Sequence, residues 1–129
     1  MRILEAVSQP VVVAATYFSN FHHAASLNTT NPTVVKASGG IMGLLAIVHI
    51  GTSSTDVRFL KLYDKATAPS ASDIPILTFA IYAGQQMDLV PSTGIQFKNG
   101  IAYRMTLNYA DNDNNAIGAN ELYISVAYN

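Results

Sequence analysis

Ile101-Ala-Tyr-Arg-Met-Thr-Leu-Asn-Tyr109 is the stretch that decides the fold, because large apolar residues alternate in it with small or polar ones. A side-chain period of two is typical of a β-strand with one face on the core. The predicted core face carries Ile101, Tyr103, Met105, Leu107 and Tyr109. The opposite face, which we expect to meet solvent or a partner, carries Ala102, Arg104, Thr106 and Asn108.

The end of the chain repeats this pattern. In 122–128 the predicted inward residues are Leu122, Ile124, Val126 and Tyr128, and the outward ones are Tyr123, Ser125 and Ala127. Further strands are predicted at 40–50, 57–63, 74–82, 87–90 and 95–97. The almost wholly apolar run 40–50 favours a central strand covered on both faces. Asn99-Gly100 is the strongest hairpin signal, because both positions tolerate positive φ.

No long segment has the three- and four-residue apolar spacing of a helix, and Gly, Pro, Asn, Asp and Ser punctuate the chain at short intervals. The sequence therefore predicts an all-β protein: an antiparallel β-sandwich, jelly-roll-like, with at least seven strands in two packed sheets.

Composition excludes several classes of function. The 129 residues make one domain, and the net charge of -1 with only 12% charged residues lacks the basic footprint of a nucleic-acid binder. The same balance argues against a polybasic membrane-surface protein. The apolar run 41–50 is too short to span a bilayer, and we read no signal peptide. The absence of cysteine excludes disulfides, thiolate metal sites and thiol nucleophiles. Such low charge suggests a surface that is partly covered in an assembly.

The first 33 residues have apolar side chains without strong periodicity, interrupted by Pro10 and Pro32. We expect 1–33 to form an N-terminal arm that packs on a neighbour, or alternatively an edge segment of the sandwich, and 34–129 to form the β-sandwich domain. The candidate interface residues of the arm are Val11, Val12, Val13, Tyr17, Phe18 and Phe21.

No group of residues predicts catalysis, a metal or a cofactor. The neighbours His22 and His23 point to opposite faces if they lie in a strand, so they cannot chelate one ion there. Asp111, Asp113 and Asn115 have the spacing that begins a calcium loop. The rest of that pattern fails, because Ala116 replaces the required glycine and Leu122 the final glutamate. A solvated turn is the simpler interpretation, and we expect no enzyme activity.

Aromatic residues fit core packing better than an exposed sugar-binding platform. Tyr103, Tyr109 and Tyr128 lie on the inward phase of their strands, and Phe59 and Phe79 lie in apolar runs. The sequence places Tyr82 and Tyr123 on outward positions, where an interface could use them.

Several motifs resemble those of small virion proteins of tailed bacteriophages. They are Lys36-Ala-Ser-Gly-Gly40, Arg58-Phe-Leu-Lys-Leu-Tyr-Asp-Lys-Ala-Thr-Ala-Pro69, Asp73-Ile-Pro-Ile-Leu77, the turns of 91–100, and the segment from Ala110-Asp111 to Asn120-Glu121-Leu122. The resemblance covers 34–129 and leaves 1–33 unmatched.

What the resemblance implies is a structural β-sandwich of the phage particle without catalytic residues. The leading hypothesis is a capsid decoration (cement) protein, a homotrimer on the capsid surface of the virion that binds the major capsid protein and is present in the host cytoplasm during assembly. The alternative is a tail, neck or fibre component, with a receptor- or glycan-binding role open to it. A free carbohydrate-binding sandwich and an enzyme are the further alternatives.

Overall fold

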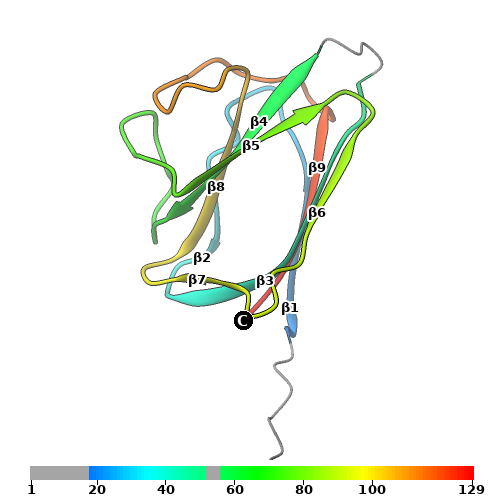
Figure 1. Ribbon diagram of the computed structural model, residues 1–129. Coiled ribbons are helices and arrows are strands. Elements are labelled where there is room, and N and C mark those ends of the chain that lie inside the picture. The colour runs from blue at the N-terminus through cyan, green and yellow to red at the C-terminus, as the bar shows by residue number, and fades with distance from the viewer. Residues whose placement is uncertain (1–17, 52–55) are drawn as a thin grey trace, which may run out of the picture.

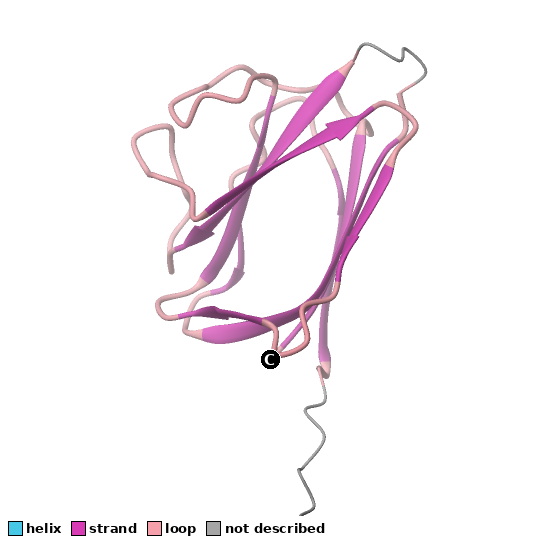
Figure 2. Cartoon of the chain, viewed as in Figure 1, coloured by secondary structure: helices cyan, strands magenta, loops and turns pink. Residues whose placement is uncertain are grey.

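The computed structural model describes residues 18–51 and 56–129, and these form two packed antiparallel sheets without a helix (Figures 1 and 2). The strands are β1 (Asn20–Ala25), β2 (Thr33–Lys36), β3 (Gly40–His49), β4 (Val57–Asp64), β5 (Leu77–Tyr82), β6 (Gln86–Leu89), β7 (Ile95–Phe97), β8 (Ile101–Thr106) and β9 (Leu122–Tyr128). The predicted antiparallel β-sandwich is confirmed.

Strand order identifies the sandwich as a jelly roll. One sheet has the order β1-β9-β3-β6, with the short β7 also on β3, and the other has the order β2-β8-β4-β5. If the short β7 is left out and the other strands are renumbered in chain order, β8 becomes strand 7 and β9 becomes strand 8. The two sheets then have the strand orders 1-8-3-6 and 2-7-4-5, which is the interleaved order of two Greek keys in a jelly roll. Most connections therefore cross from one sheet to the other at the ends of the sandwich (Figure 1).

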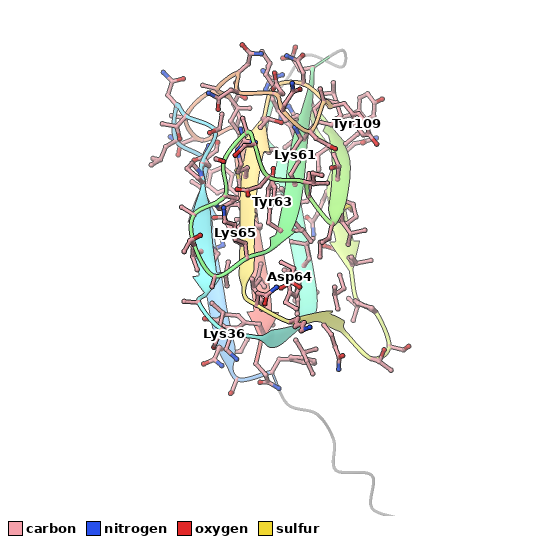
Figure 3. All side chains as sticks on the ribbon, turned by 90° about the vertical axis from the view of Figure 1, so that its left-hand side faces the viewer. Lys36, Lys61, Tyr63, Asp64, Lys65 and Tyr109 are labelled. Atoms are coloured by element: carbon pink, nitrogen blue, oxygen red, sulfur yellow. The ribbon has the colours of Figure 1, made fainter. Side chains whose placement is uncertain are left out.

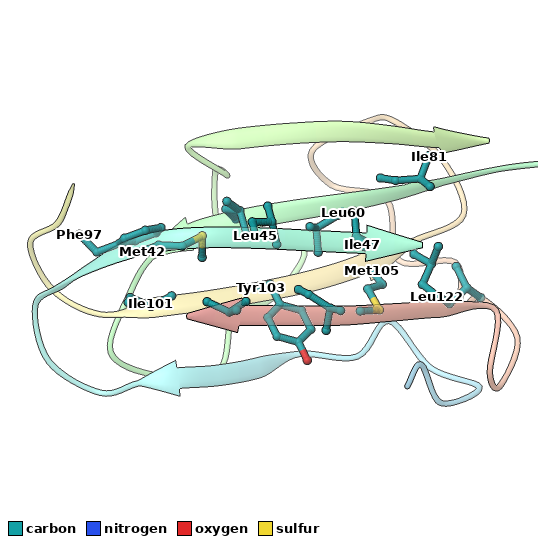
Figure 4. Close-up of a cluster of buried hydrophobic side chains, with 14 residues drawn as sticks. Met42, Leu45, Ile47, Leu60, Ile81, Phe97, Ile101, Tyr103, Met105 and Leu122 are labelled. Carbon is teal, nitrogen blue, oxygen red and sulfur yellow. The ribbon is translucent and has the colours of Figure 1, made fainter. Parts of the chain in front are cut away.

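The core lies between the sheets and is built by the alternation seen in the sequence (Figure 4). Both sheets contribute to one buried cluster: Met42, Leu45, Ile47, Leu60, Leu62, Ile81, Phe97, Ile101, Tyr103, Met105, Ile117, Leu122, Ile124 and Val126. The predicted inward residues of β9 are confirmed, with Tyr128 partly buried against the cluster. β3 is a central strand as predicted, since it pairs with β9 on one side and with β6 and β7 on the other. Its outer face is less covered than predicted, because Leu44, Ala46 and Val48 are half-buried.

The prediction for 101–109 is wrong in two respects. The strand β8 ends at Thr106, so Leu107 and Tyr109 leave the core face and are exposed. The opposite face does not meet solvent, because Ala102, Arg104 and Thr106 are all buried. The β8–β9 loop (residues 107–121) folds back over that face and covers it, as its hydrogen bonds to buried side chains show.

The predicted hairpin at Asn99-Gly100 is also wrong. β7 pairs with β3 and β8 pairs with β2 and β4, so the turn crosses between sheets. Neither residue has positive φ. The turn is held by Asp64, whose Oδ1 accepts the backbone N–H of Asn99 at 2.7 Å and of Gly100 at 3.3 Å. A side chain at position 100 would meet the carbonyl of Lys65, which explains the glycine.

The described part of the N-terminal region belongs to the sandwich. β1 pairs with β9 along its whole length, from Asn20↔Tyr128 to Ala25↔Tyr123, and β2 pairs with β8. Residues 20–25 are thus an edge strand of the sandwich, and the expected boundary at 33/34 falls inside β2. The reason is pairing: a terminal β9 with an open edge offers backbone groups that β1 satisfies. Residues 1–17 lie outside the described residues, so the arm expected there stays a prediction.

Candidate functional site

The outer face of the four-stranded sheet carries an unusual group of buried polar side chains. Lys61 and Tyr63 lie on β4, and Arg104 and Thr106 lie on the neighbouring β8, where Lys61 and Arg104 are cross-strand partners. Arg104 is 1% exposed and Lys61 is fully buried. Figure 3 shows Lys61 and Tyr63 along one strand, beneath loop segments that cross the face. Two buried cations side by side need acceptors close at hand.

The β8–β9 loop supplies acceptors to Arg104. One guanidinium nitrogen donates to the carbonyl of Asp113 at 2.7 Å and to Oδ1 of Asn114 at 3.2 Å, and the other donates to the hydroxyl of Tyr63 at 3.3 Å. These acceptors are divided between two of its nitrogens, and a planar guanidinium with five N–H donors can reach all of them, whereas an ammonium group is a compact point charge. Arg104 therefore ties the middle of the loop to the sheet.

Lys61 ties the beginning of the same loop. Its Nζ donates to the carbonyls of Asn108 and Ala110. Burial lowers the pKa of Lys61, and the nearby Asp113 opposes that effect. Tyr109 of the same loop packs edge-to-face with Phe59 on β4, with ring centroids 5.7 Å apart.

Asp113 organises the loop from within. Its carboxylate accepts the backbone N–H of Asn108 at 2.9 Å, Nδ2 of Asn108 at 3.1 Å and Nδ2 of Asn115. Burial favours the neutral acid, but these hydrogen bonds prevail and lower the pKa of Asp113. Its oxygens are thus committed to the loop, whereas Asp111 is exposed. Among residues 18–51 and 56–129 no three His, Asp or Glu side chains gather where they could hold a metal ion.

This cluster is closed, and its donors and acceptors satisfy one another. The cluster has a structural role: its charged side chains hold the β8–β9 loop on the four-stranded sheet. The sequence does not predict this buried cluster, because alternation places Arg104 on the outer face of its strand but does not show which segment covers that face. The signal that could have found it is the long Asp- and Asn-rich loop that follows a strand with an outward arginine.

The histidines do not converge. His22 and His23 point to opposite faces of β1 as predicted: Nε2 of His22 is 2.9 Å from the hydroxyl of Tyr103 in the interior, and Nδ1 of His23 is 2.8 Å from Oγ of Ser125 outside. Burial and the neighbouring His23 lower the pKa of His22. His49 is buried at the far end of β3, where its Nδ1 accepts the N–H of Gly51 at 3.0 Å. Burial, and next Arg58, lower the pKa of His49.

Arg58 and Glu121 join the two sheets at this end of the sandwich. Nε of Arg58 on β4 lies 2.6 Å from Oε2 of Glu121, which directly precedes β9. The hydrogen bond from Arg58 lowers the pKa of Glu121. The ion pair is a structural link, because both partners are engaged with each other.

A cavity of about 490 Å³ lies at the opposite end of the sandwich. Its lining includes Ile41, Asp64, Gln96 and Lys98. The carboxylate of Asp64 already holds the turn after β7, and hydrogen bonds from that turn, the one from Asn99 foremost, lower the pKa of Asp64. Of the polar side chains in the lining, the carboxylate of Asp64 is thus committed to the turn, whereas Gln96 and Lys98 have no side-chain hydrogen bond among the described residues.

The predicted interface residues fall partly outside the described residues. Val11, Val12, Val13 and Tyr17 lie there. Phe18 is half-buried, and its ring lies where a side chain at Gly43 of β3 would stand. Phe21 on β1 is 76% exposed. Of the other aromatic residues, Tyr82 is exposed and Tyr123 half-buried, whereas Tyr109, expected in the core, is 64% exposed.

Comparison with known protein families, with curated proteins and with solved structures found no match. A search of the described residues for a helix long and apolar enough to cross a membrane found none.

Proposed function

We propose that this chain is a structural protein of a bacteriophage particle, and specifically a capsid decoration (cement) protein that stabilises the head by bridging capsomers. It acts as a homotrimer on the capsid surface, with the major capsid protein as its partner. The proposal begins from the motifs of 34–129 that resemble small phage virion proteins. It assigns the chain no catalytic residue, cofactor or metal.

The observation that carries the proposal is that the chain has few charged residues and also exposes several large apolar side chains. Phe21, Ile74 and Val90 are each more than two-thirds exposed, on a chain with 12% charged residues. Scattered apolar residues are normal on a surface, but a surface this poor in charge suits a protein that is covered by its own copies and by a shell.

The internal use of polar groups supports a structural role. Arg58, Lys61 and Arg104 bond acceptors of the same chain. Such a protein would act by linkage: a molecule that binds only the assembled shell stabilises the shell by mass action, by about 2.7 kcal/mol per site at a hundred times its Kd.

The test is the copy number in purified particles of the phage that encodes the chain, with binding of the purified protein to heads that lack it. A decoration protein is present in proportion to the major capsid protein and raises the temperature at which heads open. Recovery with tails at a small copy number would favour the alternative of a tail, neck or fibre component. Absence from particles would overturn both.

A matched pair of variants sharpens this test. Phe21→Glu places a charge on the exposed aromatic of β1 and should weaken binding to heads or the trimer. Gln86→Glu places the same charge on the exposed edge of β6 and serves as the control.

A further inference from the structure

We propose that β5 is a self-association edge, through which two copies of this chain pair antiparallel about a two-fold axis at Ala80. This goes beyond the proposed function and does not depend on it. β5 is the last strand of the four-stranded sheet and pairs with β4 on one side (Figure 1). An edge strand presents a row of unpaired backbone donors and acceptors, and the natural occupant of such a row is another strand.

The phase of the β4–β5 ladder identifies the free backbone groups. The N–H of Ala83 donates to the carbonyl of Asp56 at 2.9 Å, in the same register as Ile81↔Arg58 and Phe79↔Leu60. Hydrogen-bonded pairs alternate in an antiparallel ladder, so Phe79 and Ile81 turn their backbone groups toward β4. Thr78, Ala80 and Tyr82 therefore direct theirs away from the sheet. The carbonyl of Tyr82 already accepts the N–H of Gln85 at 3.0 Å, so it would accept a partner's N–H through its second lone pair.

These three positions fit a two-fold pair. With the axis at Ala80, each Ala80 faces its own copy, and Thr78 of each chain faces Tyr82 of the other. The small, exposed side chain of Ala80 leaves the axis unobstructed. The pairing would join two four-stranded sheets into one continuous sheet.

Charge is the reason for choosing a second copy as the occupant. A two-fold contact brings each residue near its own copy, so a charged edge repels itself. No charged residue lies between Asp73 and Asp88. Tyr82 at the end of β5 is exposed, as are Ile74 (79% exposed) and Ile76 just before the strand. A second copy would therefore meet no like charge along this edge.

Other edges carry the features that block pairing. β2 has Lys36 and a register irregularity between Val34 and Lys36. β6 has four residues, among them the exposed Asp88, and β7 has only three. Short strands, bulges and charges are the usual protections of a sheet edge. Apart from β1, which begins shortly after the undescribed residues 1–17, β5 is the described edge strand that is longer than four residues and carries no charge.

Single cysteines test the register directly, because the chain has no cysteine of its own. In a hydrogen-bonded antiparallel pair the two Cα atoms are about 5.5 Å apart, within the span of a disulfide. Mild oxidation of Ala80→Cys should give a covalent dimer in high yield, and Gln86→Cys on the edge of β6 should not. Equal cross-linking of the two variants, or none of Ala80→Cys, would overturn the proposal.

Ala80→Pro tests the contact without cross-linking. It removes an N–H that points away from β4, so the β4–β5 hydrogen bonds remain. The purified wild-type chain should have the mass of an even number of copies by light scattering: two copies, or six if the trimer of the proposed function also forms. The variant should have half that mass or less. If the variant does not fold, Ala80→Lys gives a second reading, because it sets two ammonium groups at the axis and should also halve the mass. A wild type that is a monomer or a trimer would show the two-fold contact to be wrong. These measurements use the purified chain without phage particles. Their outcome is therefore independent of whether the protein binds phage heads, and the two proposals can fail separately.

Discussion

The outer faces of β8 and β9 have similar alternating sequences but different surroundings. Tyr123 and Ser125 of β9 are half-buried on the surface of the five-stranded sheet, where the hydroxyl of Ser125 lies 2.8 Å from Nδ1 of His23. Arg104 and Thr106 of β8 are buried beneath the loop 107–121. The comparison shows that alternation fixes which side chains share a face, whereas the cover of that face depends on where the next loop goes.

The largest expected effect is that of removing a cation from the covered face. Arg104→Ala leaves two buried acceptors, the carbonyl of Asp113 and the hydroxyl of Tyr63, without their donor, and it opens a cavity. We expect a loss of about 3 kcal/mol in the free energy of unfolding, measured by urea denaturation. Ser125→Ala on the face of β9 is the matched control and should cost under ~1 kcal/mol. Similar losses from the two would remove the distinction between the faces.

Asp113→Ala should have the next largest effect, because it unfastens the loop and leaves the strands in place. The loss of three hydrogen bonds to a carboxylate predicts about 1–3 kcal/mol of destabilisation. Proteolysis within 107–117 should accelerate more than global unfolding does. Asp111→Ala, which changes the exposed acid of the same loop, should leave both rates near those of the wild type.

Acid should destabilise the end of the sandwich that Arg58 and Glu121 join. The pKa of Glu121 is lowered in the folded state, so its contribution is full above the unfolded value of about 4.3 and is lost as the pH falls through the folded value. Asp113 acts in the same direction. The urea midpoint should therefore drop below about pH 4. Glu121→Gln should be less stable than wild type at pH 7 but lose less stability on acidification; an unchanged slope would contradict this assignment.

The histidines should give a smaller slope at higher pH. The pKa values of His22 and His49 are lowered by burial, so the unfolded chain binds protons more readily, and stability should fall as the pH drops below about 6.5. Urea midpoints at pH 7.5 and 5.5 measure this change. The double variant His22→Gln/His49→Gln should have a flatter profile, and a stability that rises on acidification in the wild type would refute the prediction.

A chelator of divalent cations should have no effect on the stability of the protein. The oxygens of Asp113 are occupied by Asn108 and Asn115, and the calcium pattern of 111–122 is incomplete. Addition of a chelator should leave the melting temperature unchanged. A fall of several degrees would make the loop a metal site.

The sequence by itself determined the class of fold and most of the strands. Alternation at Leu122–Tyr128 and the apolar run that became β3 suffice because burial of one face imposes a period of two on any strand. The incomplete calcium pattern likewise followed from residue types alone. The pattern of 74–82 predicts a strand, of which Leu77–Tyr82 forms β5, but it does not predict an exposed edge, because its apolar content is equally typical of a buried strand.

Only the tertiary structure decided what covers each face. The loop 107–121 returns over the four-stranded sheet and buries Arg104, which the sequence places on a solvent- or partner-facing side, together with its neighbour Lys61. It also showed that Asn99-Gly100 crosses between sheets and that 20–25 completes an edge. The physical reason is that strand periodicity is a local consequence of backbone geometry, whereas burial of a polar group depends on acceptors that come from distant positions in the chain.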